Sequence, residues 1–241
     1  MAIPSLYLPV IIMVTFIKLY SQSPAMIDTI IFDMDGVLVD SEKHWSISEA
    51  EFLATRIAAP HNEYHKDIVG MSISEIYDHL SSRYGIHMQK EEFLKSYDEM
   101  AVDIYKKSSN VMPGLMDFLI LLRNNGYTMA LASSSPRLWV SMTMERYELE
   151  SFFKVTVSAS EIACKSKPAP DIYLYTAKQL GKKPEVCLTI EDSRNGILSA
   201  KRAGMRCVGF RNGFNEEQDL SKADLVISNF EELTLDIINK F

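Results

Sequence analysis

Short apolar runs alternate along the chain with longer segments that have the apolar spacing of helices. The runs are continuous, as expected for parallel strands that are covered by helices on both faces. In one of the longer segments, Leu115, Phe118, Leu119 and Leu122 fall on one helical face. The pattern therefore predicts an α/β fold with a doubly wound parallel sheet joined by crossover helices. The predicted strands are 29–32, 128–132, 154–157, 186–190, 206–210 and 225–227, and the predicted helices between them are 114–125, 171–180 and 196–203.

The interval from residue 42 to residue 108 breaks this alternation. It contains only helical patterns, at 44–58, 64–69, 72–84 and 90–107. We interpret it as a helical cap that is inserted after the first strand, close to the edge where open α/β sheets bind ligands. A cap in this place can act as a lid. The predicted domains are a catalytic core of residues 26–41 plus 109–241 and a helical cap of residues 42–108.

The first 25 residues are an apolar extension that we do not expect to be part of the fold. Residues 6–20 are almost wholly apolar but are too short for a confident membrane span. One interpretation is a signal peptide, with Ser23, Pro24 and Ala25 at the cleavage site. We prefer an upstream extension of a chain that naturally starts at Met26. No membrane association is expected unless residues 6–20 are a genuine signal or anchor.

Composition narrows the possible partners and the compartment. The 241 residues contain 25 Lys and Arg against 32 Asp and Glu, a formal net charge of −7, so the balance does not indicate a nucleic-acid-binding protein. The three cysteines, Cys164, Cys187 and Cys207, show no CxxC spacing. Buried free thiols in a reducing compartment fit this count better than a disulfide framework, and the cytoplasm is the expected location.

Two pairs of acidic residues follow predicted strands. Asp33 and Asp35 come directly after the first strand, with Gly36 allowing a sharp turn, and Glu191 and Asp192 follow the fourth strand. Since parallel strands end at the same edge of a sheet, we expect these carboxylates to cluster there, at an exposed turn. Clustered carboxylates repel one another unless a cation neutralises them. Mg²⁺ is the predicted cation, because it prefers oxygen ligands.

Donors for a phosphate group follow the second and third strands. Ser133, Ser134 and Ser135 come at the expected start of a helix, where free amides and hydroxyls bind anions. Lys167 precedes a proline, in an extended segment from which its ammonium can reach a phosphate, although Lys165 is a competitor.

The four segments "DMDGVLVDS", "LASSS", "KSKPAPD" and "IEDSRNG" occur in the order typical of one family. Together they resemble the haloacid dehalogenase superfamily, in the subfamily with a helical cap of the C1 type after the first motif. The resemblance covers nearly all of residues 27–230 and implies a Rossmann-like core. Within the family the chain is most similar to sugar-phosphate phosphatases, β-phosphoglucomutases and phosphoglycolate phosphatases.

The resemblance also implies roles for the acidic and phosphate-binding residues. Asp33 would be the nucleophile that forms an aspartyl-phosphate, and Asp35 would be the general acid and base. Asp33, the backbone carbonyl of Asp35 and Asp192 would hold Mg²⁺, with Glu191 assisting. The residues that would hold the transferring phosphoryl group are Ser133, with Ser134 beside it, and Lys167.

Three functions stay open at this point. A mutase needs a cation in its cap for a second phosphate, but the cap loop at 70–74 has none, and Ile73 stands where the mutases have an arginine. We therefore expect a neutral cap pocket and a phosphatase that acts on a small phosphorylated metabolite, most simply a sugar phosphate. His44 matches a cap histidine of the mutases, while Trp45 and Met71 would suit the faces of a sugar. A non-catalytic binding module is the third possibility, which the intact set of acidic residues and Lys167 disfavours.

Four more polar residues have predicted roles that are structural or minor. We expect Asp40 to stabilise a turn and Ser41 to cap the first helix of the cap. His61 and His65 have a spacing found in zinc sites, but no third ligand is evident.

Overall fold

The computed structural model describes residues 26–57, 59, 64, 67–68, 71–163 and 165–241. The predicted N-terminal extension, His61, His65, Gly70 and Cys164 lie outside the described residues, as does most of the predicted helix 64–69. In the part of the chain that is described, no helix is long and apolar enough to cross a membrane.

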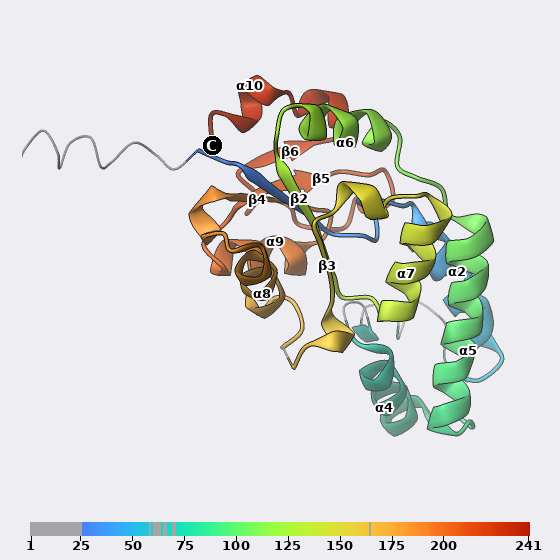
Figure 1. Cartoon of the computed structure of the whole chain (residues 1–241). Helices are drawn as coiled ribbons and strands as arrows, with labels where there is room; N and C mark the ends of the chain where they lie inside the picture. The colour runs from blue at the N-terminus through green and yellow to red at the C-terminus, as the bar shows by residue number, and fades with distance from the viewer. Residues whose placement is uncertain (1–25, 58, 60–63, 65–66, 69–70, 164) are drawn as a thin grey trace, which may run out of the picture.

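The predicted parallel sheet is confirmed. Six strands lie in the order β3-β2-β1-β4-β5-β6, and every pairing is parallel (Figure 1). The strands are β1 (Thr29–Phe32), β2 (Thr128–Ser133), β3 (Val155–Ser158), β4 (Cys187–Glu191), β5 (Arg206–Phe210) and β6 (Leu225–Ile227). Since β1 lies between β2 and β4, the chain segments that follow these three strands meet at one edge of the sheet.

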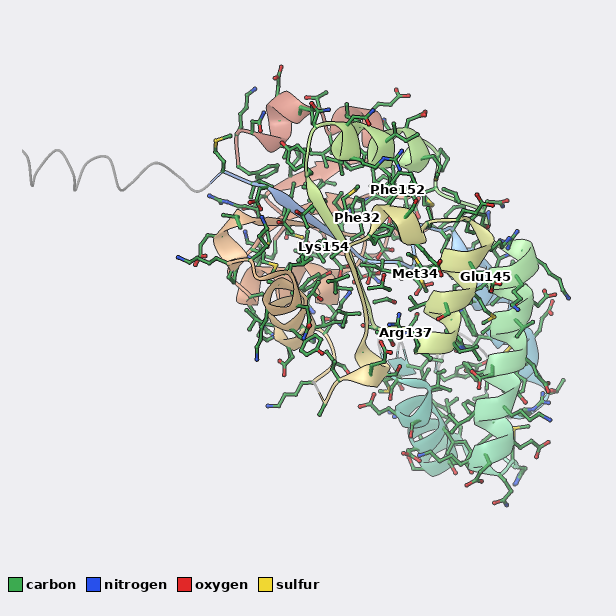
Figure 2. The ribbon with its side chains drawn as sticks, viewed as in Figure 1. Phe32, Met34, Arg137, Glu145, Phe152 and Lys154 are labelled. Atoms are coloured by element: carbon green, nitrogen blue, oxygen red, sulfur yellow. The ribbon has the colours of Figure 1, made fainter. Side chains whose placement is uncertain are left out.

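Helices cover both faces of this sheet. Phe32 of β1, labelled in Figure 2, lies on one face. Its ring packs against those of Phe118 and Phe153, with ring centroids 6.2 and 5.7 Å away. Ile31 points to the other face and packs in a cluster with Tyr173 and Ile197. The helices of the core are α6 (Leu115–Asn124), α7 (Arg137–Arg146), α8 (Asp171–Leu180), α9 (Arg194–Arg202) and α10 (Leu235–Ile238). Figure 1 shows α6 and α10 on one side of the sheet and α8 and α9 on the other. Short 3₁₀ turns lie at Glu150–Phe152, Ala159–Glu161, Pro184–Val186 and Phe230–Glu232.

Between β1 and α6 the described residues form helices and no strand, as predicted. These helices are α2 (Ser41–Ala54), α4 (Ile73–Tyr84), α5 (Lys90–Asp103) and the π-helix η1 (Ile104–Ser108). The first of them begins three residues earlier than predicted. The single helix expected at 90–107 is an α-helix that continues as a π-helix, a change of hydrogen-bond register that the apolar spacing does not reveal. In Figure 1, α4 and α5 extend away from the sheet.

The two chain segments that connect this helical insertion to the sheet are bonded to each other. Val39 and Val111 form an antiparallel bridge. The amide of Asp40 donates to the carbonyl of Asn110 at 3.0 Å, and the amide of Asn110 donates to Asp40 Oδ1 at 2.5 Å. Asp40 therefore has the structural role that we predicted, and it links the two segments that connect the insertion to the sheet.

Candidate active site

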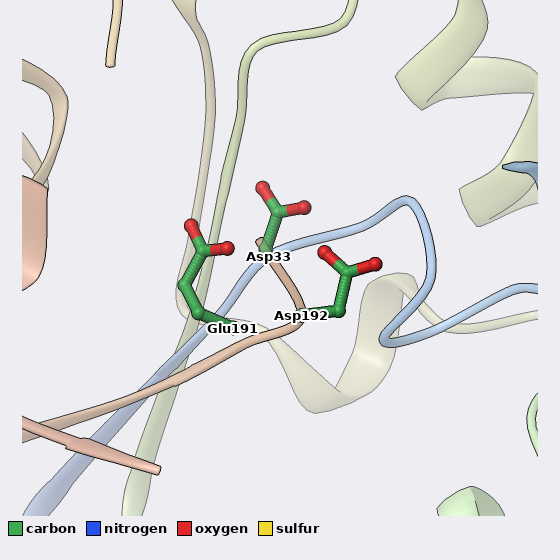
Figure 3. A group of neighbouring side chains, drawn as sticks. All are labelled: Asp33, Glu191 and Asp192. Carbon is green, nitrogen blue, oxygen red and sulfur yellow. The ribbon is translucent and has the colours of Figure 1, made fainter. Parts of the chain in front are cut away.

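Three carboxylates meet at the ends of β1 and β4. Asp33, Glu191 and Asp192 each place an oxygen within 4.8 Å of the others, and Figure 3 shows the three side chains converging. The register explains this, because Phe32 pairs with Ile190 and the residues that follow them are neighbours. The predicted clustering of these three is confirmed, but the expected exposure is wrong. Asp33 is only 8% exposed and the other two are more deeply buried, since neighbouring loops cover this edge of the sheet.

Lys167 is the counter-charge of the cluster. Its Nζ lies 2.6 Å from Asp33 Oδ1 and 2.7 Å from Glu191 Oε1, and it donates to the carbonyl of Ala132 at 3.3 Å. Its side chain is 8% exposed. Tyr173 also donates to Glu191 Oε1, at 2.5 Å. The sequence suggested a lysine that reaches a phosphate, and the structure places this lysine beside the candidate nucleophile.

The cluster is short of positive charge. Three carboxylates against one ammonium leave two negative charges in a buried volume. Burial raises the pKa of Asp33 to about 8 despite the opposing charge of Lys167, and burial together with Glu42 and Glu191 raises the pKa of Asp192 well above its usual range. A divalent cation with oxygen ligands would supply the missing charge, so these residues fit Mg²⁺.

Two glycines let the backbone approach the carboxylates closely. Gly36 has φ +72°, and a Cβ there would lie 2.0 Å from Asp192 Oδ2. A Cβ on Gly196 would lie 1.9 to 2.0 Å from the carboxylate atoms of Glu191. Asn212 holds Asp192 Oδ2 from another side, by a hydrogen bond of 3.0 Å. The cluster is therefore shaped by local backbone as well as by charge.

The carboxylate of Asp35 lies apart from the acidic cluster and accepts three hydrogen bonds. Oδ1 accepts from Ser41 at 2.5 Å and from Tyr105 at 2.6 Å, and Oδ2 accepts from Ser135 at 2.6 Å. The prediction that Ser41 caps a helix is wrong, because α2 is preceded by Asp40 without a side-chain cap bond and the Ser41 hydroxyl turns to Asp35. Whether the Asp35 carbonyl binds a metal stays a prediction.

Tyr105 is the main site residue that sequence reasoning missed. It lies on η1, 70 residues from Asp35 in sequence, and no motif surrounds it. Burial and the charge of Asp35 raise the pKa of Tyr105 well above its usual range, so its hydroxyl keeps its proton.

The three consecutive serines diverge. Ser133 is buried and accepts a hydrogen bond from the Ser135 amide at 3.0 Å, Ser134 is exposed, and Ser135 reaches Asp35. The phosphate-binding roles of Ser133, Ser134 and Lys167 remain predictions.

A cavity of about 810 Å³ opens beside Asp35. Trp45 and Met71 line it, as a substrate pocket would require, whereas His44 is not among its lining residues. The His44 Nε2 atom is buried and lies 3.9 Å from Asp40 Oδ1, at the connection to the sheet. Five aromatic residues face the cavity, namely Trp45, Tyr97, Tyr105, Trp139 and Phe214.

The expectation of a neutral pocket is wrong. Glu42 and Glu49 lie two turns apart on α2 and face the cavity together, and Glu217 joins them from the loop after β5. Burial raises the pKa of Glu42 to about 7. Among the described lining residues Lys43 is the one cation, and it is paired with Asp40. The sequence expectation was based on residues 70–74 alone, whereas these glutamates come from α2 and from the loop after β5.

Known proteins share this architecture and these motifs. The family described as "Haloacid dehalogenase-like hydrolase" matches residues 30–210. Hexitol phosphatase B of Escherichia coli is 29% identical over 78% of this chain and 85% of its own length. β-Phosphoglucomutase of Bacillus subtilis is also 29% identical, over 88% of this chain and 93% of its own.

A solved structure has the same fold at lower identity. CbbY from Rhodobacter sphaeroides, in complex with phosphate, superposes with a TM-score of 0.78 and 22% identity, covering 90% of this chain and all of the other. The acidic cluster, the lysine and the sheet that holds them thus occur together in a chain that belongs to the haloacid dehalogenase-like hydrolases.

Proposed function

We propose that the protein is a Mg²⁺-dependent phosphatase that hydrolyses a monophosphorylated sugar or polyol through an aspartyl-phosphate on Asp33. The observation that carries this proposal is the placement of Asp33. It is buried beside Lys167, while Asp35 lies on the wall of the adjoining cavity. The proposal thus takes Asp33 as the nucleophile, Lys167 as the cation for the phosphoryl group and Asp35 as the acid on the cavity wall.

The chemistry divides between the two aspartates. In the first step an oxygen of Asp33 forms a bond to phosphorus, the bond from phosphorus to the substrate oxygen breaks, and Asp35 gives a proton to the leaving alkoxide. In the second step Asp35 takes a proton from water, the water oxygen bonds to phosphorus, and the acyl phosphate bond to Asp33 breaks. The products are an alcohol and inorganic phosphate.

Asp33, Asp192 and Glu191 would hold the metal, together with the Asp35 carbonyl as the family resemblance implies. When bound, Mg²⁺ would neutralise negative charge, which would let a phosphate anion approach these three carboxylates. Lys167 adds a fixed positive charge beside Asp33 Oδ1, and its three contacts keep it oriented. The proposed site therefore has positive charge on the side where the phosphoryl group enters.

The cavity favours an uncharged polyol as the rest of the substrate. Its aromatic faces suit the C–H groups of a sugar, and the carboxylates of Glu42, Glu49 and Glu217 can accept hydrogen bonds from hydroxyl groups. In their ionised form the same carboxylates repel a second phosphate or a carboxylate on the substrate. A relative supports this substrate class, since one similar protein is named a hexitol phosphatase.

A β-phosphoglucomutase is the second candidate, because a mutase is as similar in sequence as the hexitol phosphatase. A mutase must hold the sugar by a second phosphate, and the acidic lining that we describe opposes this. A binding module without turnover is disfavoured, since Asp33, Asp35 and Lys167 are all present and Lys167 lies 2.6 Å from Asp33 Oδ1. The expected cytoplasmic location is supported by Cys187 and Cys207, which are buried free thiols of the kind found in reducing compartments.

The test is phosphate release with Mg²⁺ from hexitol, hexose and pentose monophosphates, phosphoglycolate, nucleotides and a sugar bisphosphate. Isomerisation of β-glucose 1-phosphate, primed with the bisphosphate, is measured alongside, and Asp33→Asn is the control. We expect release from neutral polyol or sugar monophosphates and little from phosphoglycolate or the bisphosphate. Isomerisation without net release would favour the mutase instead, and absence of any turnover would favour a binding module.

A further inference from the structure

Tyr105 joins the substrate cavity to Asp35 through a short chain of hydrogen bonds. The indole Nε1 of Trp45 donates to the Tyr105 hydroxyl at 3.0 Å, and this hydroxyl donates to Asp35 Oδ1 at 2.6 Å. Tyr105 is fully buried. The chain starts on α2, passes through η1 and ends on the loop after β1, so it connects three separate elements.

The direction of this chain is determined by chemistry. An indole N–H can only donate, so the Tyr105 oxygen must accept from Trp45. The single proton of the Tyr105 hydroxyl is then left for Asp35. Trp45 therefore prevents the hydroxyl from turning away.

The two oxygens of Asp35 are consequently not equivalent. Oδ1 accepts from both Ser41 and Tyr105, whereas the hydroxyl of Ser135 is the one partner of Oδ2 among the described residues. A serine hydroxyl can donate or accept, so Ser135 can donate to Oδ2 when Asp35 is ionised and accept from Oδ2 when Asp35 is protonated. Oδ2 thus accepts fewer hydrogen bonds than Oδ1 and has a partner that tolerates either protonation state.

The position of Tyr105 is held from the core. Arg146 on α7 donates to the carbonyls of Tyr105 and Lys107, at 3.0 and 2.9 Å. Trp45 in turn stacks on Trp139 of the same helix, with ring centroids 4.6 Å apart and an interplanar angle of 24°. The donor to Asp35 is thus supported by packing and by hydrogen bonds that do not involve the substrate.

We propose that Tyr105 is a positioning residue that orients Asp35, holding Oδ1 as an acceptor so that Oδ2 serves the leaving group. The inference rests on the proposed function, in which Asp35 is the acid. It adds a residue outside the acidic cluster and the serine and lysine motifs, and it assigns the proton transfer to one named oxygen.

The test uses two leaving groups. A sugar alkoxide needs a proton from Asp35, whereas the p-nitrophenolate of p-nitrophenyl phosphate is stable without one. Tyr105→Phe should lower kcat/KM roughly 10- to 100-fold for the sugar or hexitol monophosphate that the wild type hydrolyses fastest, the range for one hydrogen bond to a charged group. For p-nitrophenyl phosphate we expect a change of less than about threefold, because kcat/KM reports only the steps through the first chemical step.

Tyr147→Phe is the matched control, since the hydroxyl of this half-buried tyrosine donates to the carbonyl of Ser109 at 2.5 Å. It should leave the ratio of the two kcat/KM values unchanged. If Tyr105→Phe does not fold, Trp45→Phe replaces it, because loss of the indole N–H frees the Tyr105 proton to turn away and should move the ratio in the same direction. Equal losses for both substrates, or no loss for either, would overturn the positioning role. A wild type that hydrolyses no phosphate ester would overturn the proposed function itself, and the role of Tyr105 with it.

Discussion

Lys167→Met tests whether the acidic cluster depends on its buried cation. Methionine keeps most of the apolar length of the side chain and removes the charge that lies 2.6 Å from Asp33 and 2.7 Å from Glu191. Removing one partner of a buried ion pair costs about 3 to 5 kcal/mol of unfolding free energy. For a chain of 241 residues this corresponds to a fall in Tm of about 6 to 20 °C.

Lys182→Met is a control of the same chemistry. The Lys182 ammonium lies 2.6 Å from Asp28 Oδ2, the same distance as in the buried pair, but the two side chains are 26% and 50% exposed. An exposed pair contributes about 0 to 1 kcal/mol. The two variants therefore compare the stability contributions of two ion pairs that have the same N–O distance but differ in burial.

The assay is thermal and urea unfolding in EDTA at pH 6 and pH 9. A carboxyl whose pKa is higher in the folded state stabilises the protein at low pH and loses this contribution as the pH rises through the folded value. Since burial already raises the pKa of Asp33 to about 8, and loss of Lys167 raises it further, Asp33 ionises in the wild type above pH 8 while it stays protonated in the variant. The deficit of Lys167→Met should therefore grow above pH 8. A loss below about 1 kcal/mol, equal to that of Lys182→Met, would refute the buried cluster.

Three other perturbations test the site. Asp33→Asn should abolish phosphate release while Tm stays close to or above the wild-type value in EDTA, and a variant that kept most of its activity would exclude Asp33 as the nucleophile. EDTA should stop turnover, and added Mg²⁺ should restore it. Burial raises the pKa values of Asp33 and Asp192, so protons compete with Mg²⁺ for these carboxylates at low pH. The Kd for Mg²⁺, measured by calorimetry, should therefore fall between pH 6 and pH 8. Gly36→Ala should abolish this binding and destabilise the fold by more than about 1 kcal/mol, since its Cβ would lie 2.0 Å from Asp192 Oδ2. Gly126→Ala, with φ +77° and no atom within 4 Å of the new Cβ, measures the backbone strain alone.

The order of apolar runs was enough to predict the sheet and the helical insertion. Every predicted strand is present, within one residue at each end, because the central strands are buried on both faces and are therefore largely apolar. The acidic cluster could also be predicted, since residues that follow neighbouring parallel strands are adjacent whatever the helices do. Both inferences depend on local pattern and on one rule of sheet geometry.

The partners of Asp35 and the charge of the cavity depended on the tertiary structure. Ser41 has the position of a helix cap in the sequence, yet its hydroxyl turns to Asp35. Tyr105 belongs to an apolar helical pattern, and only a π-helical turn and the packing of α7 bring its hydroxyl to the same carboxylate. The Tyr105 contact joins residues 70 positions apart in sequence, and the Ser41 contact replaces a local cap. They follow from how the insertion packs against the sheet, which local patterns do not encode.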